Sequence, residues 1–227
     1  MRSRHLFLIL IPALILVFLS NGLHAQYNDA GLWLGISVEK KLTSSTSLLF
    51  NEECRFNENM SQAETIFSDL GLSHKLNKYF AVSLNYRFVE KRNLDASYST
   101  RHRLYGDVSG KYKIKKFTFS LRERIQSQVR DYYSSETGRF PIWYLRSKLS
   151  IKYNLSRKIT PVASVELFYQ LNNPEGNELD NIRYSIGFEY AFNKRHAIEP
   201  YYLIQQEVHV NNPVTDFIAG LSYSITF

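Results

Sequence analysis

The chain has 227 residues, a formal net charge of +7 at pH 7 and an aromatic content of 15%. Its single cysteine, Cys54, excludes an internal disulfide framework and any metal site built from several cysteines. The modest positive charge is spread along the whole chain, which argues against a nucleic-acid partner. We also find no metal-ligand spacing, phosphate-binding glycine loop or nucleic-acid motif, and so we expect no cofactor.

The first residues have the pattern of a secretory signal peptide. Arg2 and Arg4 precede an apolar run over residues 6–19, and a short polar region ends at Ala25. The apolar run is shorter than the roughly 20 residues that a membrane-spanning helix needs. We therefore predict a signal peptide over residues 1–25, cleaved after Ala25, and one barrel domain over residues 26–227.

From Leu32 onward, apolar and polar residues alternate with the period of a β-strand. In the first segment Leu32, Leu34 and Ile36 alternate with Trp33 and Gly35, and later segments repeat this pattern. The expected strands cover residues 32–39, 48–56, 66–73, 80–88, 101–112, 117–130, 143–153, 163–170, 182–192, 198–207 and 216–227.

The connections between these segments predict the architecture. Short turns alternate with longer polar loops at residues 57–62, 91–99, 131–141, 172–180 and 209–214, which is typical of outer-membrane barrels. A soluble β-sandwich also has alternating strands, but these segments are long and aromatic residues gather near many of their ends. We predict an all-β fold, a transmembrane antiparallel up-and-down β-barrel of about 10–12 strands.

The number of segments conflicts with the rule for bacterial barrels. We count eleven, whereas single-chain bacterial barrels have an even number of strands. Either the first segment is not a separate spanning strand, or one strand is missed or doubled by a bulge. We therefore expect ten or twelve strands.

The last segment carries a targeting signal. Tyr223, Ile225 and Phe227 lie on its apolar face, and Ile218 is the bulky exception on its polar face. The terminal phenylalanine resembles the C-terminal signature that the outer-membrane assembly machinery recognises. We expect export to the outer membrane of a Gram-negative bacterium, with membrane lipids and this machinery as partners. The sequence indicates no soluble or surface ligand.

Charged residues on the polar face of the strands are expected to face the lumen, because charges on the lipid face are unfavourable. Side chains that interlock and fill the lumen would make a structural or interaction protein, which is our first hypothesis. The alternative is a narrow pore that prefers anions. The candidate lumen lining comprises Arg101, Arg103, Asp107, Arg122, Arg124, Arg146, Lys148, Glu166 and Glu189.

A lipid-modifying barrel enzyme is the third hypothesis. It would need a serine at the rim within reach of His74, His102 or His209, with a carboxylate behind the imidazole. No G-x-S-x-G motif surrounds any serine, and His102 lies between two arginines, which disfavours a basic imidazole. We predict no catalytic residues and no enzyme activity.

Two glutamates fall on the apolar face of their strands. Glu52 and Glu123 lie within predicted strands and not at their ends. A bulge that reverses the alternation, or contact with another subunit, would explain each of them.

Several stretches resemble a known family. They are ECRFN at 53–57, SDLGLSHKLNKY at 68–79, NYRF at 85–88, RHRLYGD at 101–107 and NKRH at 193–196. Together they are similar to the Bacteroidetes-type outer-membrane barrels grouped as a domain of unknown function, over about residues 33–227. The resemblance implies a small outer-membrane barrel without an assigned activity, and it transfers no catalytic or binding residue.

Overall fold

The structure is a computed structural model that describes residues 27–130, 141–174, 176–210 and 212–227. The predicted signal peptide and most of the loop at 131–141 lie outside these residues. The strands are β1 (Tyr27–Lys41), β2 (Thr46–Asn57), β3 (Gln62–Lys75), β4 (Phe80–Arg92), β5 (Tyr98–Ile114), β6 (Phe117–Arg130), β7 (Ile142–Tyr153), β8 (Ile159–Gln170), β9 (Glu178–Ala191), β10 (His196–Glu207) and β11 (Val214–Thr226).

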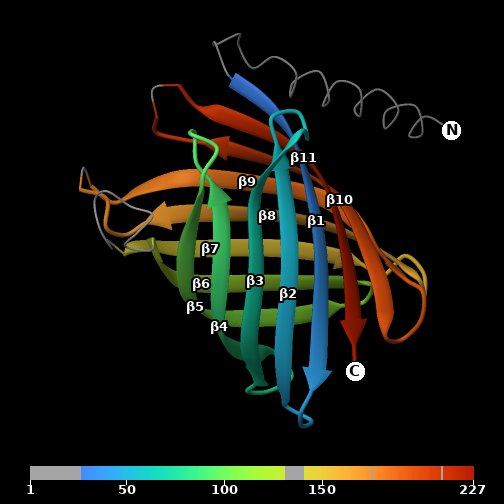
Figure 1. Ribbon diagram of the computed structural model, residues 1–227. Helices are drawn as coiled ribbons and strands as arrows, with labels where there is room; N and C mark the ends of the chain where they lie inside the picture. The colour runs from blue at the N-terminus through green and yellow to red at the C-terminus, as the bar shows by residue number, and fades with distance from the viewer. Residues whose placement is uncertain (1–26, 131–140, 175, 211) are drawn as a thin grey trace, which may run out of the picture.

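The strands form one closed barrel (Figure 1). Each strand pairs antiparallel with the next, and β1 closes the barrel by pairing parallel with β11 from Tyr27↔Val214 to Glu39↔Thr226. The expectation of an even number was wrong, because the first segment is a full strand and no other strand is missing. In an up-and-down sheet with an odd number of strands, the first and last strands point the same way, so a parallel pair joins the two edges. Closure leaves no backbone edge unpaired, as a membrane-spanning sheet requires.

The barrel has two different ends. The short turns, at residues 42–45, 76–79, 115–116, 154–158 and 192–195, lie at the end where β11 finishes, and the longer loops lie at the end where β1 begins. In Figure 1, β1–β3 and β11 run nearly upright, and β5–β9 cross behind them at a steep angle. We call these two ends the short-turn rim and the long-loop rim.

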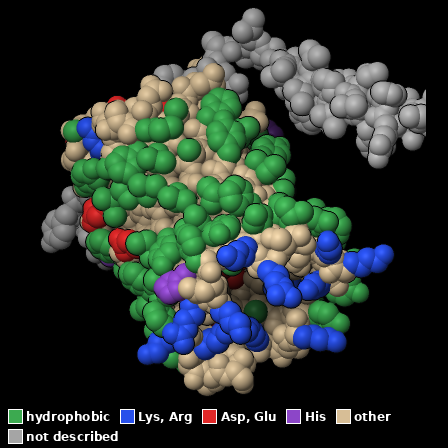
Figure 2. All heavy atoms as spheres, turned by 90° about the vertical axis from the view of Figure 1, so that its right-hand side faces the viewer, with side chains coloured by type: hydrophobic (Ala, Val, Ile, Leu, Met, Phe, Trp, Pro, Cys, Tyr) green, Lys and Arg blue, Asp and Glu red, His purple; other side chains and the backbone are tan. Residues whose placement is uncertain are grey.

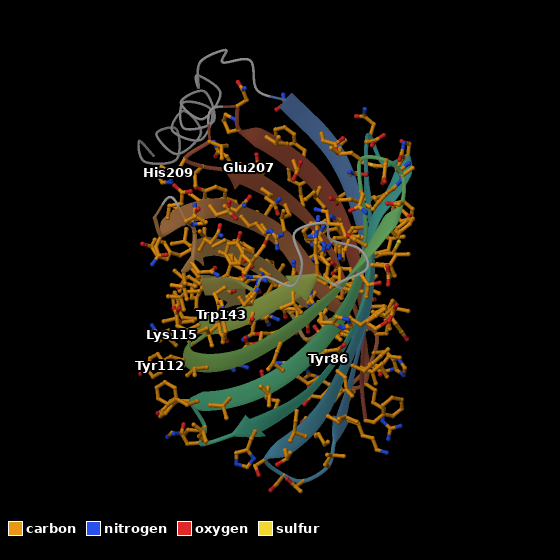
Figure 3. All side chains as sticks on the ribbon, turned by 60° about the vertical axis from the view of Figure 1, so that its left-hand side comes forward. Tyr86, Tyr112, Lys115, Trp143, Glu207 and His209 are labelled. Atoms are coloured by element: carbon orange, nitrogen blue, oxygen red, sulfur yellow. The ribbon has the colours of Figure 1, made fainter. Side chains whose placement is uncertain are left out.

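The outer surface is apolar, as the alternation predicts. Leu84 is 61% exposed and Ile186 is 66% exposed, and hydrophobic side chains cover most of the surface seen in Figure 2. Figure 3 labels three of the exposed aromatic side chains, Tyr86, Tyr112 and Trp143. No helix among the described residues is long and apolar enough to cross a membrane. The apolar surface is the lipid-facing band of a transmembrane barrel, which confirms the predicted fold class.

The bulky exception in the last strand has a partner inside the barrel. Ile218 is 1% exposed and packs with Trp33 and Leu203 in a small inward cluster. Next to this cluster, the ring of Tyr201 lies flat over Gly220, where an added Cβ would be 2.0 Å from the ring. The inner face of β10, β11 and β1 is therefore packed with apolar and aromatic groups.

The two glutamates on the apolar face do lie on the outside, and the bulge explanation was wrong. The register is continuous at both positions, since the irregularities fall at Arg55/Phe56 and Phe168/Tyr169. Glu52 accepts a hydrogen bond of 2.6 Å from Ser68, which lies directly opposite it on β3. Glu123 accepts one of 2.6 Å from Ser147, directly opposite on β7. A cross-strand hydroxyl thus partly satisfies each outward carboxylate.

Candidate functional site

Arginines and aromatic rings alternate around the inner wall. Arg55 lies 3.7 Å from the ring centroid of Trp33 on the neighbouring strand, and Arg87 lies 3.6 Å from that of Phe67. The pattern continues with Arg124 over Tyr105 at 3.7 Å. We call the following residues of β1–β9 the arginine–aromatic belt: Trp33, Arg55, Phe67, Arg87, Tyr105, Arg124, Arg146, Phe168 and Arg183.

The belt closes on itself around the lumen. Arg146 lies 4.1 Å from the ring centroid of Phe168, and Arg183 lies 4.5 Å from the same ring on its other side. Arg183 also lies 5.1 Å from the ring of Trp33, where the belt began. Aromatic faces attract cations, so the rings hold the guanidinium groups in place. The belt thus places guanidinium groups around the lumen.

Most arginines on the β3–β8 wall are neutralised by carboxylates. Arg124 binds Asp107 through two hydrogen bonds of 2.6 and 2.8 Å. Glu166 accepts from both Arg122 at 2.5 Å and Arg146 at 2.7 Å.

The same wall buries one more ion pair. Asp69, whose side chain has no exposed surface, binds Arg87 at 2.6 Å and accepts a hydrogen bond from the Tyr105 hydroxyl. Buried charges need such partners, so this part of the wall is a tightly bonded lattice.

Arg183 of the belt, and Arg103 next to the belt, form no ion pair with a carboxylate among the described residues. Arg103 donates from Nε and Nη2 to the side-chain oxygen of Gln128, at 3.0 and 2.5 Å. Arg183 donates from Nε to Gln205 at 2.6 Å. Arg103 also faces Arg87 directly across the β4–β5 pair, an arrangement of like charges that is unfavourable. Glutamine is neutral, so Arg103 has no carboxylate bound to it, and Arg183 forms no ion pair even with Glu166, which lies directly opposite it across the β8–β9 pair.

Both arginines border a cavity of about 700 Å³ inside the barrel. It begins near Asp29 and Asp216 at the long-loop end and reaches Ser37 on β1 and Glu199 on β10. A cavity of this size exceeds the space for a single water molecule many times. Side chains therefore fill the lumen only in part.

The candidate lining predicted from the sequence falls into two groups. Asp107 holds Arg124 but does not border the cavity, and Glu189 pairs with Lys152 at 3.0 Å, nearer the short turns. The Nε atoms of Arg101 and Arg122 are buried without a hydrogen-bond partner in the described chain. The predicted residues that border the cavity are Arg101, Arg103, Arg122, Arg124, Arg146, Lys148 and Glu166.

Sequence reasoning did not single out Arg55, Arg87 or Arg183, although they share the inward parity, because it concentrated on the arginine-rich run of β5–β7. It also missed the inward rings of Phe67 and Phe168. An aromatic residue on the polar, lumen-facing side of a strand, next to an arginine on the neighbouring strand, would have indicated the belt.

The three histidines considered for a catalytic role, His74, His102 and His209, contact groups other than a serine hydroxyl among the described residues. His102 Nδ1 lies 2.6 Å from the Tyr86 hydroxyl, His74 lies 2.9 Å from the Thr46 hydroxyl, and His209 contacts the carbonyl of Leu179. None of these partners is a serine. In the described parts of the chain, no three His, Cys, Asp or Glu side chains are placed to hold a metal ion.

Comparison with solved structures finds outer-membrane barrels. They include a bacterial polysaccharide outer membrane secretin (7% identity, TM-score 0.54, 78% of this chain and 63% of that chain). LpxR from Salmonella typhimurium matches with 9% identity and a TM-score of 0.54, over 84% of this chain and 87% of that chain. The NanC porin matches with 12% identity and a TM-score of 0.50, over 78% and 85%. This chain spans less than two thirds of the secretin chain, and at these identities the likeness shows the fold alone.

No curated protein matches this chain. A family model does match it, over residues 30–215, and its description is "Protein of unknown function (DUF2490)". This match confirms the resemblance to a domain of unknown function that the sequence motifs indicate. The chain belongs to the DUF2490 family.

Proposed function

We propose that this protein is a narrow outer-membrane passage for small anions, which bind at the arginine–aromatic belt on their way through. The observation that carries the proposal is the pair Arg103 and Arg183. Their guanidinium groups border the cavity and are held by glutamine oxygens, without an ion pair to a described carboxylate.

The energetics of buried charge support this assignment. A charged group in a protein wall is unfavourable unless an opposite charge or several hydrogen bonds compensate it. Arg103 lies opposite Arg87 and near further arginines of the belt, so a mobile anion from solution would supply the missing charge. Rings of arginine or lysine are a common means by which pores select anions.

A structural or interaction role is the second candidate. The ion-pair lattice around Asp69, Asp107 and Glu166 fills the β3–β8 wall, and this observation favours a barrel stiffened for a purpose other than transport. In that case the long loops would carry the function.

Location and export are part of the proposal. The signal peptide over residues 1–25 would direct the chain across the inner membrane of a Gram-negative bacterium. Tyr223, Ile225 and Phe227 would then present the last strand to the assembly machinery. The lipid-facing outer surface and the barrel folds of the similar structures support an outer-membrane site.

The test is the reversal potential of the purified, refolded protein in a planar bilayer under a potassium chloride gradient. The wild type is expected to conduct in steps and to prefer chloride. The variant Arg103→Gln/Arg183→Gln should lose most of that preference. The control Arg92→Gln/Arg130→Gln removes the same charge from two long-loop-end arginines that do not border the cavity, and it should behave like the wild type.

Three results would contradict the proposal. They are absence of conductance from protein shown to be folded and inserted, a preference for potassium, and an unchanged chloride preference in the Arg103/Arg183 variant. The first of these would favour the structural role.

A further inference from the structure

The short-turn rim is strongly basic. Every short turn has an exposed lysine or arginine in it or directly beside it, and two hairpins are especially rich. Lys113, Lys115 and Lys116 belong to the β5–β6 hairpin, and Arg157 and Lys158 to the β7–β8 turn. Figure 2 shows Lys and Arg side chains gathered at one end, below the hydrophobic surface.

This positive charge is not compensated within the described chain. The described acidic side chains nearest the short-turn rim are Glu39, Glu189 and Glu199, and Glu189 already pairs with Lys152. Glu39 accepts a hydrogen bond from Ser47. None of the exposed lysines and arginines of the rim forms an ion pair with a described residue. The rim therefore presents many exposed basic side chains without an ion-pair partner among the described residues.

Two of the rim lysines contact rings of the lipid-facing surface. Lys78 Nζ is 4.8 Å from the ring centroid of Tyr79, and Lys116 Nζ is 5.9 Å from that of Tyr153. The Tyr153 ring in turn packs against Phe117, at 4.9 Å. Such rings belong to the aromatic girdle that lies at the level of the lipid headgroups. These contacts put the ammonium groups of Lys78 and Lys116 at headgroup depth on the outside of the barrel.

The long-loop rim is different. It carries Glu58, Asp95, Glu178 and Glu207, and Figure 3 labels Glu207 beside His209 where β10 ends. The hydroxyl and backbone N–H of Ser97 donate hydrogen bonds to Asp95, which lowers the pKa of that carboxyl. The long-loop rim thus combines acidic and basic side chains, and Lys91 and Arg92 pair there with Glu64 and Glu58. The exposed lysines and arginines of the short-turn rim have no such described partners.

We propose that the short-turn rim binds the phosphate headgroups of anionic phospholipids, so that the barrel is surrounded at this level by a shell enriched in them. Charge complementarity and the position of the lysines over the aromatic girdle favour lipid over a soluble polyanion. The proposal rests on bilayer insertion and does not require anion passage through the lumen.

The test uses the refolded full barrel in phosphatidylcholine vesicles that contain a trace of spin-labelled lipid. The fraction of motionally restricted label is measured with phosphatidylglycerol and with phosphatidylcholine. Restricted phosphatidylcholine reports insertion by itself. We expect stronger association of phosphatidylglycerol that declines as salt is raised. The variant Lys113→Gln/Lys115→Gln/Lys116→Gln should reduce this preference about fivefold or more, the scale expected for basic residues near an anionic surface.

The matched control is Lys91→Gln/Arg92→Gln/Arg130→Gln, which removes three positive charges at the opposite end. It should keep the wild-type preference. Equal association of both lipids with the wild type would overturn the proposal, and so would a preference that falls in the control but not in the rim variant. Binding of a soluble polyanion without any lipid preference would also overturn it, and would point to a macromolecular partner.

Discussion

Two sets of arginines border the same cavity and differ in their partners. Arg124 and Arg146 are held by carboxylates of neighbouring strands, whereas Arg103 and Arg183 are held by glutamine oxygens. Side chains of the first set complete their charge balance inside the protein, so their expected role is to stabilise the barrel. Side chains of the second set form no ion pair with a described carboxylate, so on our proposal their role is to attract an anion from solution. On our proposal, the same residue type stabilises the barrel at one place and binds anions at another.

The largest loss of stability is expected where one carboxylate forms ion pairs with two arginines. Glu166→Gln leaves Arg122 and Arg146 without their shared counter-charge, which should lower the free energy of unfolding by about 3–5 kcal/mol. Urea titration of protein folded into vesicles, followed by the fluorescence of its two tryptophans, measures this change. Glu199→Gln is the control, since Glu199 borders the cavity without an ion pair to a described residue. Equal stability of both variants would refute the stabilising role of the lattice.

A smaller loss of stability is expected when the apolar part of the inner wall is altered. An added Cβ at Gly220 would be 2.0 Å from the Tyr201 ring, so Gly220→Ala should lower the free energy of unfolding by about 1–3 kcal/mol. Gly106→Ala is the matched control, because its nearest heavy atom would lie at 3.7 Å. The same urea titration compares the two, and a similar result for both would show that the ring moves aside freely.

The smallest effect on stability is expected from the second set of arginines. Arg103→Gln/Arg183→Gln removes uncompensated charge and breaks no ion pair with a described residue. We expect a change within about 1 kcal/mol in the free energy of unfolding, in either direction, because lost hydrogen bonds and relieved repulsion oppose each other. A loss as large as that of Glu166→Gln would place these arginines in the stabilising lattice.

The sequence predicts the faces of the strands far better than the contacts across them. Period-two alternation identifies the lipid-facing surface and the inward position of residues such as Arg103, Arg146 and Glu166, because it depends only on local backbone geometry. The bonding of Arg124 to Asp107, and of Arg122 to Glu166 across β7, depends on the stagger between strands. Stagger is a property of the closed barrel and has no local signal.

The closure of the barrel also explains the other features of the structure that the sequence does not predict. The parallel pair of β1 and β11 joins the two ends of the chain, and neither strand carries a residue that shows its partner. The inward place of Ile218 depends on Trp33 and Leu203, which come from strands far away in the sequence. The outward place of Glu52 becomes understandable once Ser68 is known to lie opposite it.

The most direct test of the central claim is the dependence of single-channel conductance on potassium chloride concentration. If anions bind at Arg103 and Arg183, the conductance of the wild type should saturate as the concentration rises. The Arg103→Gln/Arg183→Gln variant should saturate only at a clearly higher concentration, or not at all. A conductance that rises linearly in both proteins, or saturates identically in both, would contradict the account.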